Sequence, residues 1–140
     1  MYKPTTKFLI VDDFSTSRKI VKNALSDMGY PNSAEAVDGV EAYQLLVEHV
    51  GTGAPFDFII CDWNMPNMLG IDLLKKLRAE NKFKEIPFIL LTVESEQSQI
   101  LEALKAGVTD YIVKPFTPEG LKTKLEIAYK KTSNPLRLAK

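Results

Sequence analysis

Three aspartates, a threonine and a lysine each stand just after a short apolar run. Asp12 and Asp13 follow Phe8–Val11, Asp62 follows Phe58–Cys61, Thr92 follows Phe88–Leu91, and Lys114 follows Tyr111–Val113. In open α/β sheets the working crevice lies outside the carboxyl ends of the strands. If these runs are parallel strands, the five polar side chains meet at one edge. Three carboxylates, one hydroxyl and one ammonium there predict a site for a divalent metal and a phosphoryl group.

The adjacent pair Asp12–Asp13 is the metal-binding part of this prediction. Two like charges directly after a buried strand cost stability unless a cation offsets them. Mg²⁺ prefers about six hard oxygen ligands and keeps several waters, so two or three carboxylates with a neighbouring backbone carbonyl suit it. Taken alone, the pair fits equally well as acidic charge ahead of a helix over Ser15–Ile20. Beside the other three residues, the metal interpretation is favoured.

Asp62 is the candidate nucleophile of the site. A carboxylate can itself attack a phosphoryl group and form an acyl phosphate. Phosphoryl transfer needs alignment and neutralisation of the equatorial oxygens more than covalent help from the protein. Lys114 would supply positive charge and Thr92 a hydrogen bond. As isolated residues, these two would be a solvated lysine and an ordinary threonine at the end of a strand.

The elements that must position these residues follow from the apolar pattern. Predicted strands are Phe8–Val11, Phe56–Cys61, Phe88–Leu91 and Tyr111–Val113, apolar as in strands buried on both faces, with Ala34–Val37 as a weaker fifth.

Five segments between and after the strands have helical spacing. They are Val21–Met28, ended by Gly29; Val40, Tyr43, Leu46, Val47 and Val50, behind a capping box of Asp38 and Glu41; Ile71–Leu77; Ile100–Leu104, ended by Gly107; and Leu121–Ala128, begun at Thr117–Pro118. This alternation predicts an α/β fold, a doubly wound five-stranded parallel sheet with five helices on both faces.

The bulk properties of the chain are those of one ordinary globular domain. It has 140 residues, with 18 basic against 18 acidic side chains, which gives no reason to expect nucleic-acid binding. The N-terminus has no secretory signal pattern, and no stretch approaches the roughly 20 apolar residues that span a bilayer. The single Cys61 is expected in the core. We therefore expect a soluble cytoplasmic protein with a domain over 1–131 and a short basic tail over 132–140.

Three aromatic or apolar residues near the site are harder to place. Trp63 and Met65 stand in a loop that runs to Gly70, and we expect them to be too exposed for core residues. Either a partner surface or packing across the mouth of the site would explain them. Tyr111 opens the last strand, and is either an edge aromatic or a switch whose ring is buried in one state and exposed in another.

With these residues in view, the chain resembles response-regulator receiver domains, and among them the CheY-like chemotaxis regulators. The resemblance runs from about Lys7 to about Lys130, and rests on Leu9–Asp13, Cys61–Pro66, Leu91–Glu94 and Tyr111–Thr117. It implies a flavodoxin-like, CheY-like fold in which Asp62 accepts a phosphoryl group from a histidine kinase. It also implies a cis bond between Lys114 and Pro115.

The resemblance assigns roles residue by residue. Mg²⁺ would be bound by Asp13, Asp62 and the main-chain carbonyl of Asn64, with Asp12 helping through water. Thr92 and Lys114 would hold the phosphoryl oxygens, and movement of Thr92 would let Tyr111 turn inward. The implied partners are a CheA-like kinase and a FliM-like flagellar motor switch protein. The implied contact residues are Ser95, Ile100, Tyr111, Val113 and Lys124.

Two residues near the site depart from the family pattern. Leu69 stands where an aspartate is common, and Val93 stands where alanine or glycine is frequent. The larger Val93 could crowd Thr92 or Tyr111.

The leading interpretation is a stand-alone, monomeric phospho-signalling module that catalyses only its own phosphorylation and dephosphorylation and works by binding a partner. The alternatives are a phosphate sink, a single-domain receiver of another pathway, an FMN-binding electron carrier using Ser15–Ser17, and a metal-dependent phosphohydrolase.

Overall fold

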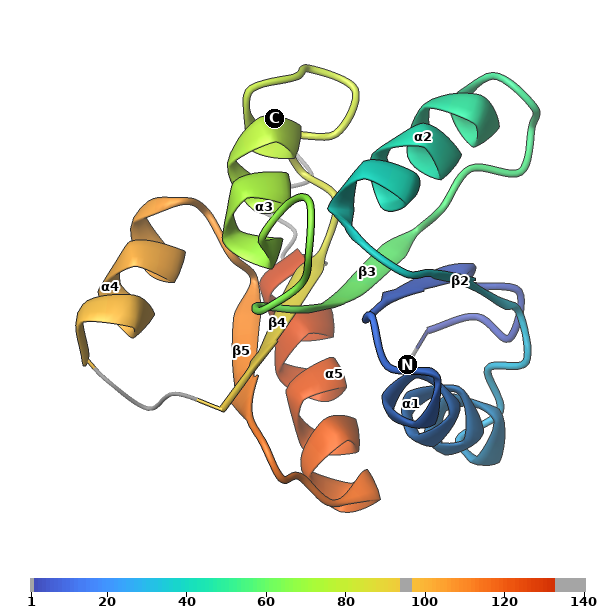
Figure 1. Ribbon diagram of the computed structural model, residues 1–140. Helices are drawn as coiled ribbons and strands as arrows, with labels where there is room; N and C mark the ends of the chain where they lie inside the picture. Colours follow the sequence, from blue (N-terminus) through green and yellow to red (C-terminus); the bar gives the residue numbers. More distant parts are fainter. Residues whose placement is uncertain (1, 94–96, 133–140) are drawn as a thin grey trace.

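The computed structural model describes residues 2–93 and 97–132, in which five parallel strands form one sheet (Figure 1). The strands are β1 (Phe8–Val11), β2 (Ser33–Ala36), β3 (Phe58–Asp62), β4 (Phe88–Thr92) and β5 (Asp110–Val113). Their order across the sheet is β2-β1-β3-β4-β5, with every neighbouring pair parallel. In this doubly wound order β2 is added on one side of β1, and the later strands β3, β4 and β5 are added on the other side.

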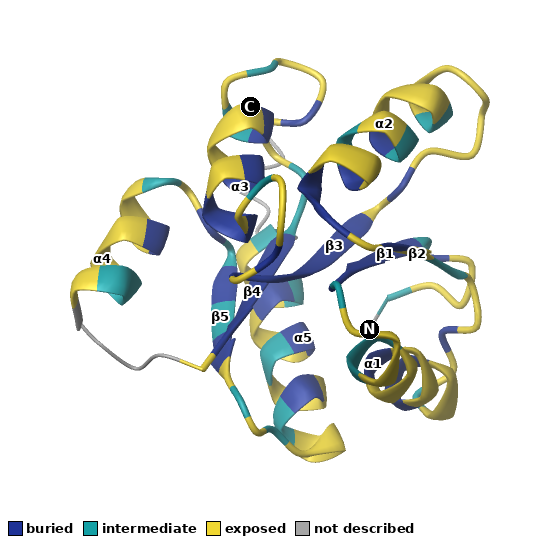
Figure 2. Cartoon of the chain, viewed as in Figure 1, coloured by how far each residue is buried: buried dark blue, intermediate teal, exposed yellow. Residues whose placement is uncertain are grey.

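The five helices cover both faces of the sheet (Figure 1). They are α1 (Ser15–Asp27), α2 (Gly39–Val50), α3 (Gly70–Arg78), α4 (Gln97–Lys105) and α5 (Pro118–Thr132). Helices α1 and α5 pack on one face and α2, α3 and α4 on the other, so the core has two layers, with the buried strands between them (Figure 2). The predicted fold class is confirmed.

The strand boundaries bring the candidate residues closer to the sheet than predicted. Asp62 and Thr92 are the last residues of β3 and β4, and Lys114 follows β5 directly. At the other end, β3 begins at Phe58 and not at Phe56. The polar edge of the sheet is therefore formed by the strand ends themselves, which fixes its backbone through the ladder hydrogen bonds.

Helix α2 differs from the expected apolar stripe. Leu46 of that stripe is buried and Tyr43 packs against the core, but Val40, Val47 and Val50 are exposed, and Ala42, outside the stripe, is buried. The small Ala42 lets the helix approach the sheet closely, and the three valines on the adjoining side of the helix remain exposed. The helix starts as predicted, because the Asp38 carboxylate accepts from the Glu41 amide at 2.8 Å and the Glu41 carboxylate accepts from the Val37 amide at 3.1 Å.

Within the described ranges, 2–93 and 97–132, no helix has the length and apolar content to cross a bilayer.

Candidate functional site

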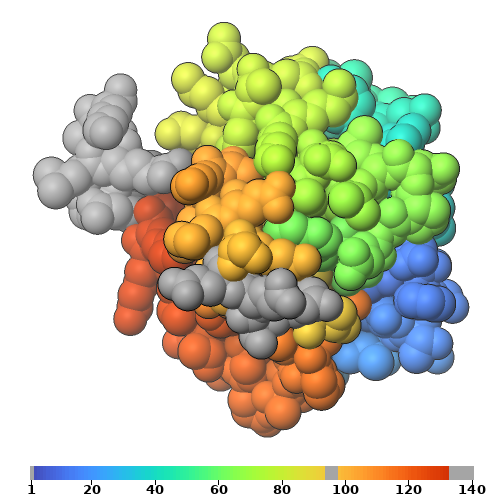
Figure 3. All heavy atoms as spheres, turned by 60° about the vertical axis from the view of Figure 1, so that its left-hand side comes forward, coloured from blue at the N-terminus to red at the C-terminus, as the bar shows by residue number. Residues whose placement is uncertain are grey.

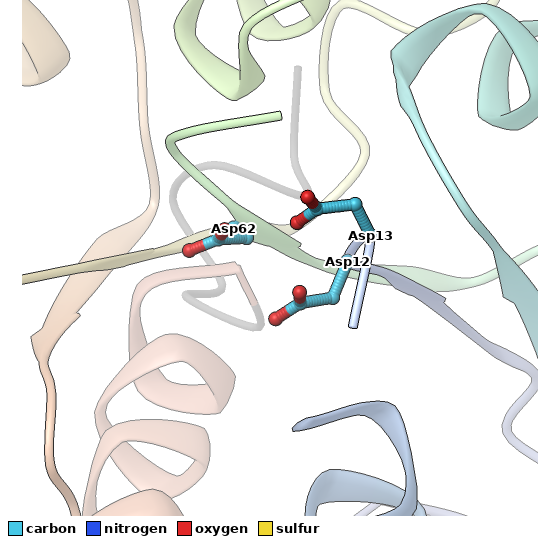
Figure 4. A group of neighbouring side chains, drawn as sticks. All are labelled: Asp12, Asp13 and Asp62. Carbon is cyan, nitrogen blue, oxygen red and sulfur yellow. The ribbon is translucent and has the colours of Figure 1, made fainter. Parts of the chain in front are cut away.

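Three carboxylates lie together where β1 and β3 end (Figure 4). Oxygen atoms of Asp12, Asp13 and Asp62 all lie within 4.8 Å of one another. Asp12 is 1% exposed and Asp62 is 7% exposed, so their charges are largely withdrawn from water. One oxygen of Asp13, Oδ1, is buried and has no hydrogen-bond partner among the residues that the structure describes. Hard oxygen donors with one unsatisfied buried atom fit a small divalent cation.

Lys114 is the positive group of the site. Its Nζ lies 3.0 Å from Asp62 Oδ1 and 3.2 Å from Asp12 Oδ2. The backbone holds this side chain in place, because the Lys114 amide donates to the Thr92 carbonyl at 2.7 Å and so extends the β4–β5 ladder by one residue. The peptide bond from Lys114 to Pro115 is cis, as the resemblance implied. One ammonium thus bridges acids from two strands.

The electrostatics of the site favour an additional cation. Burial raises the pKa of Asp62 above its ordinary value, and the charges of Asp12 and Asp13 add to the rise, while Lys114 opposes it. Burial also opposes the charged form of Lys114, but its contacts with Asp62 and Asp12 raise its pKa. Lys114 therefore stays protonated, and a single ammonium does not fully offset three carboxylates.

The other predicted site residues lie around this group at different depths. Thr92 is buried at the end of β4, and Asn64 is exposed in the loop after β3. Tyr111 is half-buried and packs against the core layer under α2, α3 and α4.

The predicted contact face is formed by α4, β5 and α5, and Figure 3 turns it forward. On it, Ile100 and Lys124 are half-buried and Val113 is exposed, whereas Ser95 lies outside the described residues.

The expected exposure of Trp63 and Met65 is wrong. They are only 6% and 7% exposed and belong to the core layer under α2 and α3. The Trp63 amide donates to the Leu91 carbonyl at 2.8 Å, so the extended backbone continues past the end of β3. Side chains alternate along an extended segment, and Trp63 therefore points to the same face as Cys61. This alternation was the signal in the sequence from which the burial of Trp63 could have been predicted.

Gly70 explains how the loop after Asp62 closes. Its amide donates to the Trp63 carbonyl at 2.9 Å, and a Cβ atom on Gly70 would collide with the main-chain oxygen of Asp62. A glycine lets the start of α3 press against the backbone of the candidate nucleophile.

Arg18 was not among the predicted site residues. From α1 its guanidinium donates to the Asp12 carbonyl at 2.7 Å and to the Glu35 carboxylate at 2.9 Å, so it ties the end of β1 to β2. No pattern in the sequence distinguishes this arginine from a solvated one.

Cys61 is buried as expected, and burial raises the pKa of its thiol.

Comparisons with known proteins identify the family and support the fold. A family model described as the response regulator receiver domain matches residues 8–126. Chemotaxis protein CheY1 of Helicobacter pylori is 54% identical over 86% of this chain and 94% of its own length. Chemotaxis protein CheY of Pseudomonas aeruginosa is 50% identical over 91% and 98%. Among solved structures, the chemotaxis response regulator CheY4 of Vibrio cholerae superposes with a TM-score of 0.76 at 36% identity, covering 88% of this chain and 98% of that one.

Proposed function

The chain belongs to the response-regulator receiver family and is closely related to CheY chemotaxis regulators, and on that premise we propose that it is a phospho-signalling receiver in which Asp62 accepts the phosphoryl group. The observation that carries the proposal is the Lys114 ammonium, which contacts Asp62 and Asp12; the neighbouring Asp13 has a buried Oδ1 without a hydrogen-bond partner in the described part of the chain. The proposed nucleophile, its counter-charge and the proposed metal ligands thus lie close together.

We propose that Asp12, Asp13, Asp62 and the main-chain carbonyl of Asn64 hold Mg²⁺. When bound, the ion would neutralise charge on the transferring phosphoryl group. In this scheme the Asp62 carboxylate attacks phosphorus and displaces the histidine nitrogen of the donor. Lys114 holds a charge against the phosphoryl oxygens, and the Thr92 hydroxyl donates a hydrogen bond to them. The position of Asp62, Thr92 and Lys114 at or directly after strand ends supports this scheme, which asks of kinase and receiver mainly that they align.

The output of this receiver is proposed to be a binding event on the face of α4, β5 and α5. Thr92 and Tyr111 act as the switch in this scheme, and phosphorylation shifts an existing equilibrium toward an inward Tyr111. The relatives carry chemotaxis in their names, which supports a CheA-like kinase as donor and a FliM-like motor switch protein as target. We assign 1–131 to the receiver and 132–140 to a tail, and propose that the protein works as a cytoplasmic monomer.

The test follows the fluorescence of Trp63, which is the single tryptophan and follows Asp62 directly. Mg²⁺ is added first and acetyl phosphate second, with mass spectrometry to detect the phosphoprotein. We expect one signal change with Mg²⁺ and a second, decaying change with acetyl phosphate. Asp62→Asn should lose the second change. A chain that gives no phosphoprotein under these conditions would contradict the proposal.

A further inference from the structure

Asp110, Tyr111 and Lys124 form a connected group at the outer edge of the sheet. Asp110 is the first residue of β5 and only 7% exposed. Its Oδ1 accepts from the Tyr111 amide at 2.8 Å and from Lys124 Nζ at 3.1 Å. Strand β5 is an edge strand, so amides on its outer side have no strand partner. Asp110 satisfies one of these amides and at the same time anchors a lysine of α5.

A second lysine holds the same carboxylate. Lys131 Nζ lies 3.9 Å from Asp110 Oδ2 and donates to the Thr109 carbonyl at 2.7 Å. Asp110 Oδ1 therefore accepts two hydrogen bonds, and Oδ2 lies in a longer ion pair with a second lysine of α5. A carboxylate bonded in this way anchors the Lys124 ammonium.

Lys124 reaches around the edge of the sheet to the ring of Tyr111. Side chains alternate along β5, so Ile112 lies in the layer under α1 and α5, and Tyr111 packs in the opposite layer. Although Lys124 belongs to α5, its Nζ lies 5.0 Å from the Tyr111 ring centroid. A cation within about 6 Å of an aromatic face is attracted to it. The Lys124 ammonium thus contacts the Tyr111 ring and the Asp110 carboxylate at the same time.

We infer that Lys124, anchored by Asp110, is a positioning residue that holds the Tyr111 ring in its half-exposed position before phosphorylation. The inference rests on the proposed function, in which Tyr111 is the switch. An inward ring leaves the cation and loses the contact, so Lys124 weights the equilibrium toward the half-exposed state. A contact of this kind at a partly exposed site changes the ratio of the two positions about two- to fivefold.

The test measures the exposure of the Tyr111 ring by fluorine NMR of protein labelled with 3-fluorotyrosine. The Tyr111 line is assigned by its loss in Tyr111→Phe, and its shift between H₂O and D₂O reports contact with solvent. Lys124→Met removes the charge and keeps the stem, Asp110→Asn releases the ammonium, and Lys124→Arg restores a cation. Lys122→Met is the matched control, because Lys122 is an exposed lysine of the same helix without an ion pair or ring contact in the described part of the chain.

We expect the solvent shift of Tyr111 to fall in Lys124→Met and Asp110→Asn and to keep its wild-type value in Lys124→Arg and Lys122→Met. An unchanged or larger solvent shift in folded Lys124→Met would overturn the inference. The measurement uses unphosphorylated protein, so its result is independent of the acetyl phosphate assay. Failure of that assay would remove the switch role of Tyr111, whereas failure of the solvent shift would remove only the role of Lys124.

Discussion

Lys114 and Asp62 form an ion pair across two strands that are not neighbours, with 3.0 Å between Nζ and Oδ1. β4 lies between β3, which carries Asp62, and β5, which Lys114 follows, and the carbonyl of its last residue, Thr92, accepts a hydrogen bond from the Lys114 amide. The pair therefore depends on the whole parallel edge, and the charge balance of Asp62 can be tested without any phosphodonor.

Neutralising Asp62 should stabilise the protein in the absence of metal. Burial raises the pKa of Asp62. An acid with a raised pKa in the folded state stabilises the fold below its unfolded pKa, and this contribution is lost as pH rises through the folded value. We expect Asp62→Asn to be more stable than the parent at pH 7, with the gap closing below about pH 4, the ordinary range of aspartate. Urea unfolding across this range measures it, with exposed Asp27→Asn as control. A gap that widens toward acid would refute the expectation.

Mg²⁺ should stabilise the parent protein through Asp13. The buried Oδ1 atom of Asp13 has no hydrogen-bond partner in the described ranges. At tenfold excess over its dissociation constant, the ion should add about 1.4 kcal/mol to the free energy of unfolding. Asp13→Ala should be at least as stable as the parent without metal and should lose this gain, while Asp27→Ala should keep it. Thermal melts with and without Mg²⁺ decide the matter, and an undiminished Mg²⁺ gain in Asp13→Ala would exclude Asp13 as a ligand.

Asp38 should contribute about 1–2 kcal/mol to the free energy of unfolding, because it caps the start of α2 and binds the loop after β3. Its carboxylate accepts from the Glu41 amide at 2.8 Å and from the Asn67 amide group at 2.7 Å, and these bonds lower its pKa. The contribution is present above the unfolded pKa and is lost as pH falls through the folded one. Asp38→Ala should therefore cost most at neutral pH, with a smaller loss for Asp38→Asn, which keeps a cap. Equal losses at neutral and acid pH in urea titrations would contradict this.

Gly70→Ala should disturb the backbone of Asp62, the proposed nucleophile. The new Cβ would strike the Asp62 carbonyl, and we expect a loss of about 1–3 kcal/mol, as for other overpacked sites. Gly51→Ala is the matched control, because Gly51 has a φ of −101° and open space at its Cβ. Urea unfolding of both variants compares them, and the prediction fails if they are equally stable.

The polar edge of the parallel sheet was predictable because the apolar runs and the chemistry of the polar residues that follow them indicated the same site. Buried parallel strands are apolar throughout, so their ends are marked by the first polar residue, as at Asp62 and Thr92. The capping box at Asp38 was predictable for a similar reason, since its partners lie within four residues of one another.

The failures concern side-chain direction. On α2, Leu46 of the predicted core-facing stripe is buried, but its three valines are exposed, and Ala42, outside that stripe, is buried. Helical period identifies faces, and tertiary packing decides which one is buried. Contacts between distant segments, such as Asp38 with Asn67 and Asp110 with Lys124, depend on how loops and helices dock, which the local pattern does not encode.

The bridge from Lys114 to Asp12 spans 102 residues, nearly from one end of the sheet-forming sequence to the other. During synthesis, β1 and β3 emerge long before β5, so a ribosome-bound intermediate carries the acidic cluster without its counter-charge. A chain terminated anywhere ahead of residue 114 lacks that ammonium altogether. The full set of three carboxylates and one ammonium can therefore form only after β5 and Lys114 have been translated, and shorter products lack it.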